Sequence, residues 1–409
     1  MRRIAIVGGG QSGLQLALDL LGQRYEVTVV SNRTPEQIRK GRVTSSQFMF
    51  HDSLQNERDL GINFWGKECP ITEGIAFSVP GPDGSRALYW EAKLDHYGQS
   101  VDQRMKFAGW MEEFAKRGGN LLFEDAGVPE LEKYASTNDL VIVAAGKGEV
   151  ARMFETDTAN SPFSTPMRAL ALTYVKKMAP KKPFTAVAFS LIPGVGEYFV
   201  FPALTTTGAC EIMVFEGVVG GPMDCWGDVK TPQQHLERSK EILKKFLPWE
   251  AERCREIELT DDMGVLAGRF APTVRKPTCR LPSGRLVLGM ADVVVLNDPI
   301  TGQGSNTASK AAKVYSGRIL EHGEKPFDAA WMQDTFDCFW NYAQWVVRWT
   351  NSMLTPPPPH ILQLMGAASQ IPSLASRIAN GFNNPPDYNP WWFDPAEAQK
   401  FTGAQRTSA

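Results

Sequence analysis

The sequence predicts an α/β protein in which a discontinuous Rossmann-like domain carries an inserted antiparallel sheet and is followed by a helical C-terminal region. Three observations predict this architecture. A strand, a glycine-rich turn and a helix succeed one another at the N-terminus within ~30 residues. Apolar strands that end in small residues recur near positions 140 and 286. The segments between them are rich in β-branched and aromatic residues.

Runs of apolar residues place the elements of the Rossmann-like domain. The strands are expected at Ile4–Val7, Val27–Val30, Leu140–Gly146 and Leu286–Asp292, and the helices at Leu14–Leu21 and Thr307–Leu320. Because these strands lie in widely separated segments, we expect one parallel sheet that is assembled discontinuously.

The remaining segments have a different composition. Residues 70–95 and 165–270 alternate β-branched and aromatic residues with Pro and Gly, which is typical of an antiparallel sheet. An inserted sheet beside a nucleotide fold usually supplies the wall of a substrate site. In residues 331–409, tryptophans at roughly helical spacing predict a helix packed on the body, and the prolines at 356–359 end it.

Composition and charge exclude several classes of protein. The chain has 409 residues, of which 43% are hydrophobic and 22% charged, as in globular proteins rather than disordered or fibrous ones. The net charge of -2 shows no excess of basic residues of the kind that binds nucleic acid. The six cysteines form no CxxC pair and the five histidines show no ligand spacing, so no metal site is predicted.

The N-terminus resembles a secretory signal, because Arg2 and Arg3 precede an apolar run. Glycines interrupt that run, and no small-residue cleavage site follows it. No other apolar stretch reaches the ~18 residues that span a bilayer. We therefore expect a soluble, cytoplasmic protein with no membrane partner.

Gly8-Gly9-Gly10-Gln11-Ser12-Gly13 matches GxGxxG between a predicted strand and a predicted helix. Gly8 allows the tight turn, Gly10 lets the backbone approach a pyrophosphate, and Gly13 permits close packing of helix on strand. The helix N-terminus attracts the phosphate charge. The motif therefore predicts dinucleotide binding.

The second strand lacks the acidic residue that usually holds the adenosine ribose, and carries Ser31, Asn32 and Arg33 in its place. One reading is NADP, whose 2′-phosphate Arg33 could accommodate. The other is an FAD site that forgoes the carboxylate. The first motif does not decide between them.

The third fragment favours FAD. Asp292 follows a strand, and Pro299 and the run Gly302-Gln303-Gly304-Ser305-Asn306 open a helix. Asp292 is suited to a ribityl hydroxyl, while the turn and the helix N-terminus can face the isoalloxazine and stabilise negative charge. Two separate nucleotide-contacting turns on one sheet fit a long cofactor better than NADP.

These motifs resemble those of the FAD-dependent monooxygenases of the aromatic hydroxylase fold. Single-component members usually carry an Asp-Gly pair in the middle fragment, whereas residues 145–152 here read Ala-Gly-Lys-Gly-Glu-Val-Ala-Arg. No second GxGxxG occurs either. The resemblance therefore implies that reduced flavin arrives from elsewhere.

Over nearly the whole chain, the sequence resembles the oxygenase component of the two-component styrene and indole monooxygenases. The likeness includes residues 145–147, 160–163, 298–306 and 348–351. Ala291 departs from the family, which usually has Gly before the Asp. The resemblance implies FAD-binding segments at 1–69, 96–164 and 271–330, substrate-domain segments at 70–95 and 165–270, and a helical region at 331–409.

The loop Thr44–Phe50 faces the flavin ring in this fold. The styrene branch carries Asn, Val and His at alternate positions of this loop, and the indole branch carries Ser, Gln and Met. Ser45, Gln47 and Met49 match the second set. Alternate positions of an extended loop point to one side, so the three could share a face toward the pocket. The other reading is that they only pack the loop.

The resemblance implies an indole monooxygenase that uses FADH₂ and O₂ to epoxidise the indole 2,3-double bond through a flavin C4a-hydroperoxide, leading to indoxyl and indigo. A separate NAD(P)H-dependent flavin reductase would donate FADH₂. The resemblance leaves open whether the protein forms a homodimer. Because the cofactor performs the hard step, the protein positions the alkene and excludes water.

Four alternatives stay open. A styrene monooxygenase making styrene oxide shares every large motif and differs in pocket residues. A self-sufficient aromatic hydroxylase would need the missing Asp-Gly pair. A halogenase would show a Trp-x-Trp-x-Ile-Pro motif, in which Trp65, Trp90 and Trp110 do not stand. A flavin carrier without turnover would fail to oxidise any alkene.

Overall fold

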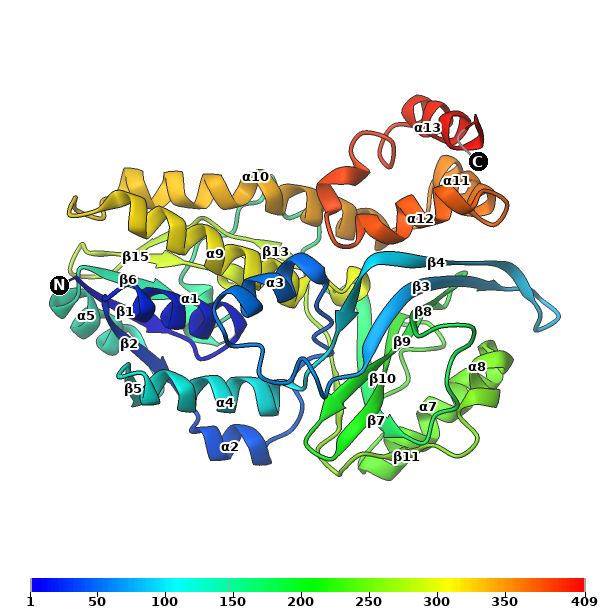
Figure 1. Ribbon diagram of the computed structural model, residues 1–409, viewed down its shortest axis with the longest axis horizontal. Coiled ribbons are helices and arrows are strands. Elements are labelled where there is room, and N and C mark those ends of the chain that lie inside the picture. The colour runs from blue at the N-terminus through cyan, green and yellow to red at the C-terminus, as the bar shows by residue number, and fades with distance from the viewer. Residues whose placement is uncertain (1, 147, 408–409) are drawn as a thin grey trace.

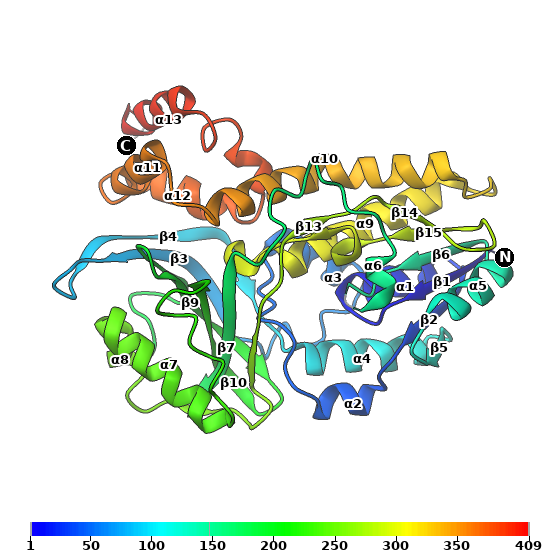
Figure 2. The same ribbon diagram turned by 180° about the vertical axis from the view of Figure 1, so that it is seen from behind.

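Two sheets lie side by side, and a long helix runs along the first sheet and reaches the second with its C-terminal end (Figures 1 and 2). The computed structural model describes residues 2–146 and 148–407. Helices cover both sheets, and the C-terminal helices gather over the second sheet. The predicted fold class, a Rossmann-like core with an antiparallel region and a helical C-terminus, is confirmed.

The Rossmann-like sheet has six strands in the order β14-β15-β6-β1-β2-β5. Their bounds are β1 Arg3–Val7, β2 Glu26–Ser31, β5 Asn120–Phe123, β6 Leu140–Val143, β14 Thr278–Arg280 and β15 Leu286–Gly289. All neighbours pair in parallel except β14, which is antiparallel to β15. The central strands are buried on both faces, which explains their continuous apolar sequences.

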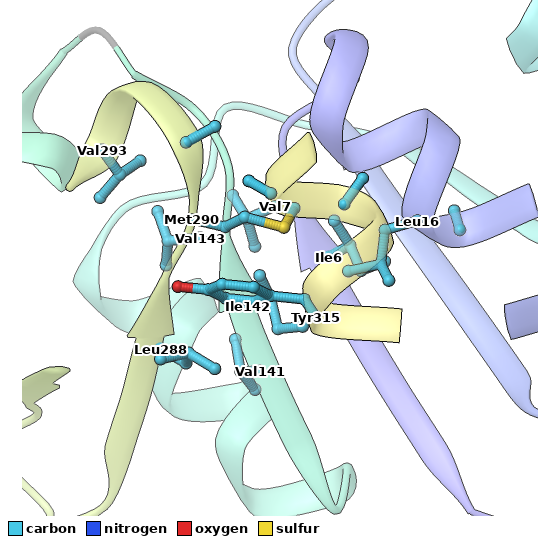
Figure 3. Close-up of a cluster of buried hydrophobic side chains, with 14 of the residues drawn as sticks. Ile6, Val7, Leu16, Val141, Ile142, Val143, Leu288, Met290, Val293 and Tyr315 are labelled. Atoms are coloured by element: carbon cyan, nitrogen blue, oxygen red, sulfur yellow. The ribbon is translucent and has the colours of Figure 1, made fainter. Parts of the chain in front are cut away.

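Helices from distant parts of the chain pack on this sheet or against the helices that cover it. They are α1 Gln11–Gly22, α2 Pro35–Lys40, α3 His51–Asp59, α4 Gln103–Lys116, α5 Val128–Thr137, α6 Glu149–Arg152 and α9 Gly304–His322. The predicted helices are longer than expected, since α1 begins inside the glycine-rich motif and α9 directly after Gln303. Figure 3 shows the Tyr315 ring of α9 lying among the side chains of β1, β6 and β15. The Tyr315 hydroxyl donates to the Gly289 carbonyl oxygen at 2.8 Å.

The second sheet has eight strands, in the order β11-β7-β10-β9-β8-β3-β4, with β12 also paired to β7. Their bounds are β3 Ile71–Pro80, β4 Arg86–Gln99, β7 Arg168–Lys176, β8 Ala186–Ile192, β9 Gly196–Thr205, β10 Gly208–Val218, β11 Glu258–Leu259 and β12 Val265–Gly268. The expectation of a wholly antiparallel sheet is wrong at one pair, because β3 and β8 run parallel. A long crossover joins these two strands through the other domain, and a crossover of that length permits parallel pairing.

Two hydrophobic clusters cover the faces of the second sheet. On one face lie α7 Pro232–Phe246 and α8 Pro248–Arg253, and on the other lie α11 Pro359–Ala368, α12 Pro372–Gly381 and α13 Pro395–Thr407 (Figure 1). There are also short elements, which are β13 Thr273–Val274, β16 Val295–Leu296, η1 Ala291–Val293, η2 Pro299–Thr301 and η3 Pro385–Tyr388.

The tryptophan-rich segment forms α10, Ala329–Met353, which joins the two halves of the molecule. Trp331 near its start belongs to the hydrophobic cluster of the Rossmann-like sheet, and Trp349 near its end belongs to a cluster of the second sheet. The helix ends before the proline run, as expected. Among the described residues, we find no helix long and apolar enough to cross a membrane.

Candidate active site

The carboxyl ends of β1, β6 and β15 meet at one edge of the Rossmann-like sheet. The Ala144 N–H donates to the Val7 carbonyl oxygen at 2.8 Å, and the Met290 N–H donates to the Val143 carbonyl oxygen at 2.9 Å. The strand order reverses beside β1, because β2 lies on one side of it and β6 on the other. Ligands of open α/β sheets bind in the crevice at such a switch point.

The three glycines of the first motif occupy the places that the motif requires. A Cβ on Gly8, whose φ is +133°, would lie 2.6 Å from the Ala144 carbonyl carbon. A Cβ on Gly13 would lie 2.0 Å from the Gly8 oxygen, so helix and turn pack too closely for any side chain. A Cβ on Gly10 would meet open space within 4 Å, which leaves backbone accessible to a pyrophosphate.

Gly146 and Asp292 bring the second and third fragments into contact. A Cβ on Gly146 would lie 2.4 Å from the Asp292 Cβ, so this approach excludes any larger residue at 146. Asp292 lies in η1 directly beyond the end of β15, as predicted. Its neighbour Ala291, where the related family usually has Gly, adopts a left-handed φ of +54°. Lys147 lies outside the described residues.

Ser31 and Arg33 end β2 and form a local turn. The Ser31 hydroxyl donates to the Arg33 carbonyl oxygen at 2.9 Å and accepts from the Arg33 N–H at 3.2 Å. Ser31 is buried, while the Arg33 side chain is exposed. The structure therefore places an exposed cation at the edge where the ribose carboxylate of other Rossmann proteins would stand.

The second glycine-rich turn follows η2. Gly302 has a left-handed φ of +65°, and a Cβ on Gly302 or Gly304 would meet nothing within 4 Å. The Gln303 side chain donates to the Phe382 carbonyl oxygen at 2.8 Å. The hydroxyls of Thr301 and Thr350 lie 2.7 Å apart, which ties Pro299–Thr301 to α10.

Asn306 at the start of α9 holds the loop Thr44–Phe50 against this turn. Its Nδ2 donates to the Phe48 carbonyl oxygen at 2.8 Å and to the Gly302 carbonyl oxygen at 3.0 Å. Its Oδ1 accepts from the Phe50 N–H at 2.8 Å. Asn306 is only 1% exposed, so these bonds form away from water. Met49 lies between the two clamped residues.

The three predicted specificity residues, Ser45, Gln47 and Met49, differ in their hydrogen bonds and burial. Gln47 donates from Nε2 to the Tyr174 hydroxyl at 2.9 Å, and that hydroxyl donates to the Ser45 carbonyl oxygen at 2.8 Å. Met49 is fully buried, and its backbone pairs with Gln99 of β4. Burial raises the pKa of Tyr174 well above its usual range, so the hydroxyl remains protonated.

No pattern in the sequence indicates Tyr174 as a partner of the loop, because it lies in an ordinary buried strand, β7. Gln11, a spacer position of the first motif, is a second residue with a role that the sequence did not indicate. It donates to Glu57 Oε1 at 3.0 Å, and Lys106 forms an ion pair with the same carboxylate at 2.7 Å. Glu57 and Lys106 are both nearly inaccessible to water. This pair anchors the glycine-rich turn to α3 and α4.

The residues at this edge fit a flavin nucleotide. Gly10, Gly302 and Gly304 leave open space at both turns. Within the described chain, the buried Asn297 Nδ2 and Gln303 Oε1 have no hydrogen-bond partner. Buried polar atoms of this kind normally require a partner, which a flavin ring and its ribityl chain can supply. No group of three potential metal ligands occurs among the described residues.

An apolar cavity of about 20 Å³ lies behind the second turn, between the second sheet and the C-terminal helices. Its wall includes Phe77, Trp90, Phe189, Trp349, Phe382 and Trp392. Phe382 links cavity and turn, because its carbonyl oxygen accepts from Gln303. The cavity has room for about one water. Side chains must therefore move before a bicyclic ring can enter it.

Comparisons with known proteins identify the family of the chain. Residues 146–253 match the family described as the styrene monooxygenase A putative substrate binding domain. The chain is 30% identical over 393 residues to styrene monooxygenase StyA of Pseudomonas fluorescens, covering 94% of this chain and 93% of the relative. The same identity and coverage hold for StyA of a Pseudomonas species.

Solved structures share the fold at low sequence identity. The flavin-dependent brominase Bmp2 superposes with a TM-score of 0.66 at 13% identity, over 99% of both chains. A flavoprotein/dehydrogenase from Cytophaga hutchinsonii superposes with a TM-score of 0.67 at 13% identity, also over 99% of both chains. The fold is thus shared with a flavin-dependent brominase, whereas the sequence is most similar, among the proteins named here, to the two styrene monooxygenases. The chain is a flavin-dependent monooxygenase and belongs to the styrene monooxygenase family.

Proposed function

We propose that this protein is the oxygenase component of a two-component indole monooxygenase. It takes FADH₂ from a separate NAD(P)H-dependent flavin reductase and epoxidises the indole 2,3-double bond with O₂. The main support for this proposal is the pair of hydrogen bonds that the Asn306 side chain makes with the backbone of Phe48 and Phe50. These bonds hold the loop that contains Ser45, Gln47 and Met49 against the second glycine-rich turn.

FAD is the proposed cofactor. Gly8, Gly10 and Gly13 would hold its pyrophosphate, with Ser31 and Arg33 near its ribose. Asp292 would hold the ribityl chain, and Pro299, Gly302, Gln303, Gly304 and Asn306 would form the turn that faces the ring. When bound in its reduced form, the flavin supplies an electrophilic oxygen derived from O₂.

The residues of the chain hold the alkene and exclude water. Ser45 Oγ accepts from the Gln47 N–H at 3.1 Å, and Gln47 Oε1 lies 3.3 Å from the Tyr174 hydroxyl, so each oxygen keeps a lone pair for a further donor. Indole has an N–H group that can donate to such an acceptor, whereas styrene has no polar atom. A pocket with an unpaired acceptor discriminates against the apolar substrate.

The test is an aerobic assay with FAD, NADH, a separate flavin reductase and catalase, in which indole and styrene compete. We expect indole to be consumed faster and indigo to form, strictly dependent on the reductase. Reductase without the oxygenase is the control for free flavin oxidation. Epoxidation of styrene in clear preference to indole would contradict the indole assignment, and product formation without reductase would contradict the two-component system.

A loop exchange tests the specificity residues directly. The triple variant Ser45→Asn, Gln47→Val, Met49→His carries the styrene-branch set and should shift the ratio of kcat/KM toward styrene by about tenfold. Thr44→Val is the matched control, because the Thr44 hydroxyl donates to Gln103 on the exposed side of the loop. An unchanged ratio in the triple variant would mean that these residues only pack the loop.

Styrene is the second candidate substrate, favoured by the likeness to the two StyA proteins. The aromatic wall of the cavity suits a phenyl ring as well as a bicyclic one. Chiral analysis of styrene oxide from the same assay measures this activity.

A further inference from the structure

Three buried carboxyl groups meet a single arginine where the second sheet touches the second glycine-rich turn. Glu197 of β9 and Glu216 of β10 are directly opposite each other across the strands. Asp298 precedes η2, and its Oδ1 accepts from the Ile300 N–H at 3.1 Å. All three residues are at most 2% exposed, so water does not screen their charges.

Arg168 neutralises one of the three. Its guanidinium binds Glu197 with two hydrogen bonds of 2.7 and 3.0 Å. The guanidinium also donates to the Met167 carbonyl oxygen at 3.1 Å and, at the end of α10, to the carbonyl oxygens of Met353 at 3.4 Å and Leu354 at 3.2 Å. The hydrogen bonds of Arg168 are thus made to partners other than Glu216 and Asp298.

Glu216 and Asp298 lie within hydrogen-bonding reach of each other. As carboxylates, both would be acceptors only. Neither oxygen of Glu216, nor Oδ2 of Asp298, meets a donor among the residues that the structure describes. Two adjacent, buried and unpaired negative charges would be strongly destabilising, whereas one proton between them removes a charge and creates a donor.

We propose that Glu216 and Asp298 share one proton and form a buried carboxylic acid–carboxylate pair that positions the second glycine-rich turn. The pair joins the end of β10 to the residue that begins η2. Through η2 it holds Gly302, whose carbonyl oxygen accepts from Asn306, and so the loop Thr44–Phe50. Its role toward a flavin rests on the proposed function, but its protonation does not.

Burial and the neighbouring carboxylate raise the pKa of Glu216 well above its usual range, and burial also raises the pKa of Asp298. Since the folded state keeps a proton that the unfolded state releases above pH ~4.5, unfolding becomes more favourable as pH rises. Relative to Glu216→Gln, the unfolding equilibrium constant of the unsubstituted protein should increase by about tenfold per pH unit up to the folded pKa.

The first experiment uses the full chain without flavin. Infrared spectra at pH 8 should contain the C=O band of a protonated carboxylic acid, and Glu216→Gln should abolish it. Glu211→Gln is the matched control on the same strand, because burial raises the pKa of Glu211 only to about 7. A spectrum without this band, or a stability difference between Glu216→Gln and the unsubstituted protein that does not change with pH, would overturn the shared proton.

The second experiment tests positioning. Gln at 216 can still donate to Asp298, so Glu216→Gln should bind FAD with a dissociation constant within about twofold of the unsubstituted protein. Glu216→Ala leaves Asp298 without a donor, and should weaken FAD binding about tenfold and release more peroxide per NADH in the coupled assay. Circular dichroism checks that each variant folds. If Glu216→Ala does not fold, FAD affinity and peroxide yield are measured on Asp298→Asn instead.

Equal FAD affinity and peroxide yield in Glu216→Ala and the unsubstituted protein would overturn the positioning role. The infrared and unfolding results need neither flavin nor alkene. A protein that shows the band but oxidises no alkene would therefore contradict the proposed function and leave the carboxyl pair intact.

Discussion

The Asn306 side chain donates to the Phe48 carbonyl oxygen at 2.8 Å across a sequence separation of 258 residues. The same amide accepts from the N–H of Phe50, so both sides of Met49 are held by a residue of the second glycine-rich turn. The loop that carries Ser45, Gln47 and Met49 is therefore tied to the turn through Asn306.

Removing this clamp should uncouple the reaction. Asn306→Ala leaves the Phe50 N–H and two carbonyl oxygens without a partner, and should lower the free energy of unfolding by about 3 kcal/mol. We expect FADH₂ to be oxidised while most of the oxygen leaves as peroxide. Urea unfolding and a peroxide assay measure both effects. Asn306→Asp, which keeps the shape but turns the donor into an acceptor facing two carbonyl oxygens, should be at least as damaging; wild-type coupling in it would contradict the clamp.

Ala291 and Gly146 offer a paired test of the backbone where the second and third fragments meet. Ala291 has a left-handed φ of +54°, which costs a non-glycine residue about 1 kcal/mol. Ala291→Gly should therefore leave stability unchanged or raise it by up to ~1 kcal/mol, since glycine also adds freedom to the unfolded chain. Thermal unfolding measures the change, and a loss of more than ~1 kcal/mol would show that the methyl group packs favourably.

Gly146→Ala should have the opposite sign. Its new methyl group would lie 2.4 Å from the Asp292 Cβ, which forces the two fragments apart. We expect a loss of about 2 kcal/mol and weaker FAD binding. Fluorescence titration with FAD reports the binding, and unchanged affinity would argue against Asp292 as a contact of the cofactor.

The buried ion pair beneath the first turn should respond strongly to a single substitution. Lys106→Met leaves the buried Glu57 charged without a counter-ion, with the Gln11 amide as its remaining donor, and should cost about 3–5 kcal/mol. Adding Glu57→Gln removes the stranded charge, so the double variant should recover much of the loss. A double-mutant cycle by urea unfolding measures the coupling. Additive effects of the two substitutions would mean that the ions do not depend on each other.

His235 should make the protein sensitive to acid. It is buried against Trp226, with ring centroids 4.5 Å apart, and desolvation lowers the pKa of His235 to about 4 despite an opposing hydrogen bond to the Leu172 backbone. The unfolded state takes up a proton near pH 6.5 that the folded state does not, so stability falls between pH 6.5 and pH 4, by about 3 kcal/mol.

His235→Phe keeps an aromatic ring on Trp226 and removes the titration. The difference in unfolding free energy between the variant and the unsubstituted protein should therefore change with pH in this window and be constant above it. Thermal unfolding at half-unit steps of pH measures this. A constant difference from pH 4 to pH 7 would mean that the pKa of His235 is the same in the folded and unfolded protein, and would contradict the lowered pKa.

Local patterns in the sequence determined the elements of the Rossmann-like domain. A strand followed by Gly8, Gly10 and Gly13 has few alternative structures, because only glycine tolerates the turn and the approach of helix to strand. The apolar runs of the parallel strands are equally unambiguous, since both faces are buried. The family follows from the same local motifs, because they recur in order along the whole chain.

Tertiary structure alone decided which distant side chains meet. Gln47 faces Tyr174, Gln11 faces Glu57, and Glu216 faces Asp298, and in each case the partners come from separate segments. No local periodicity encodes such pairs, because a strand or helix specifies which face a residue occupies but not what lies opposite. The parallel pairing of β3 with β8 has the same origin, since it depends on a crossover through another domain. Sequence thus determined the secondary-structure elements and the glycine-rich turns, whereas packing between segments decided how the polar groups around them are satisfied.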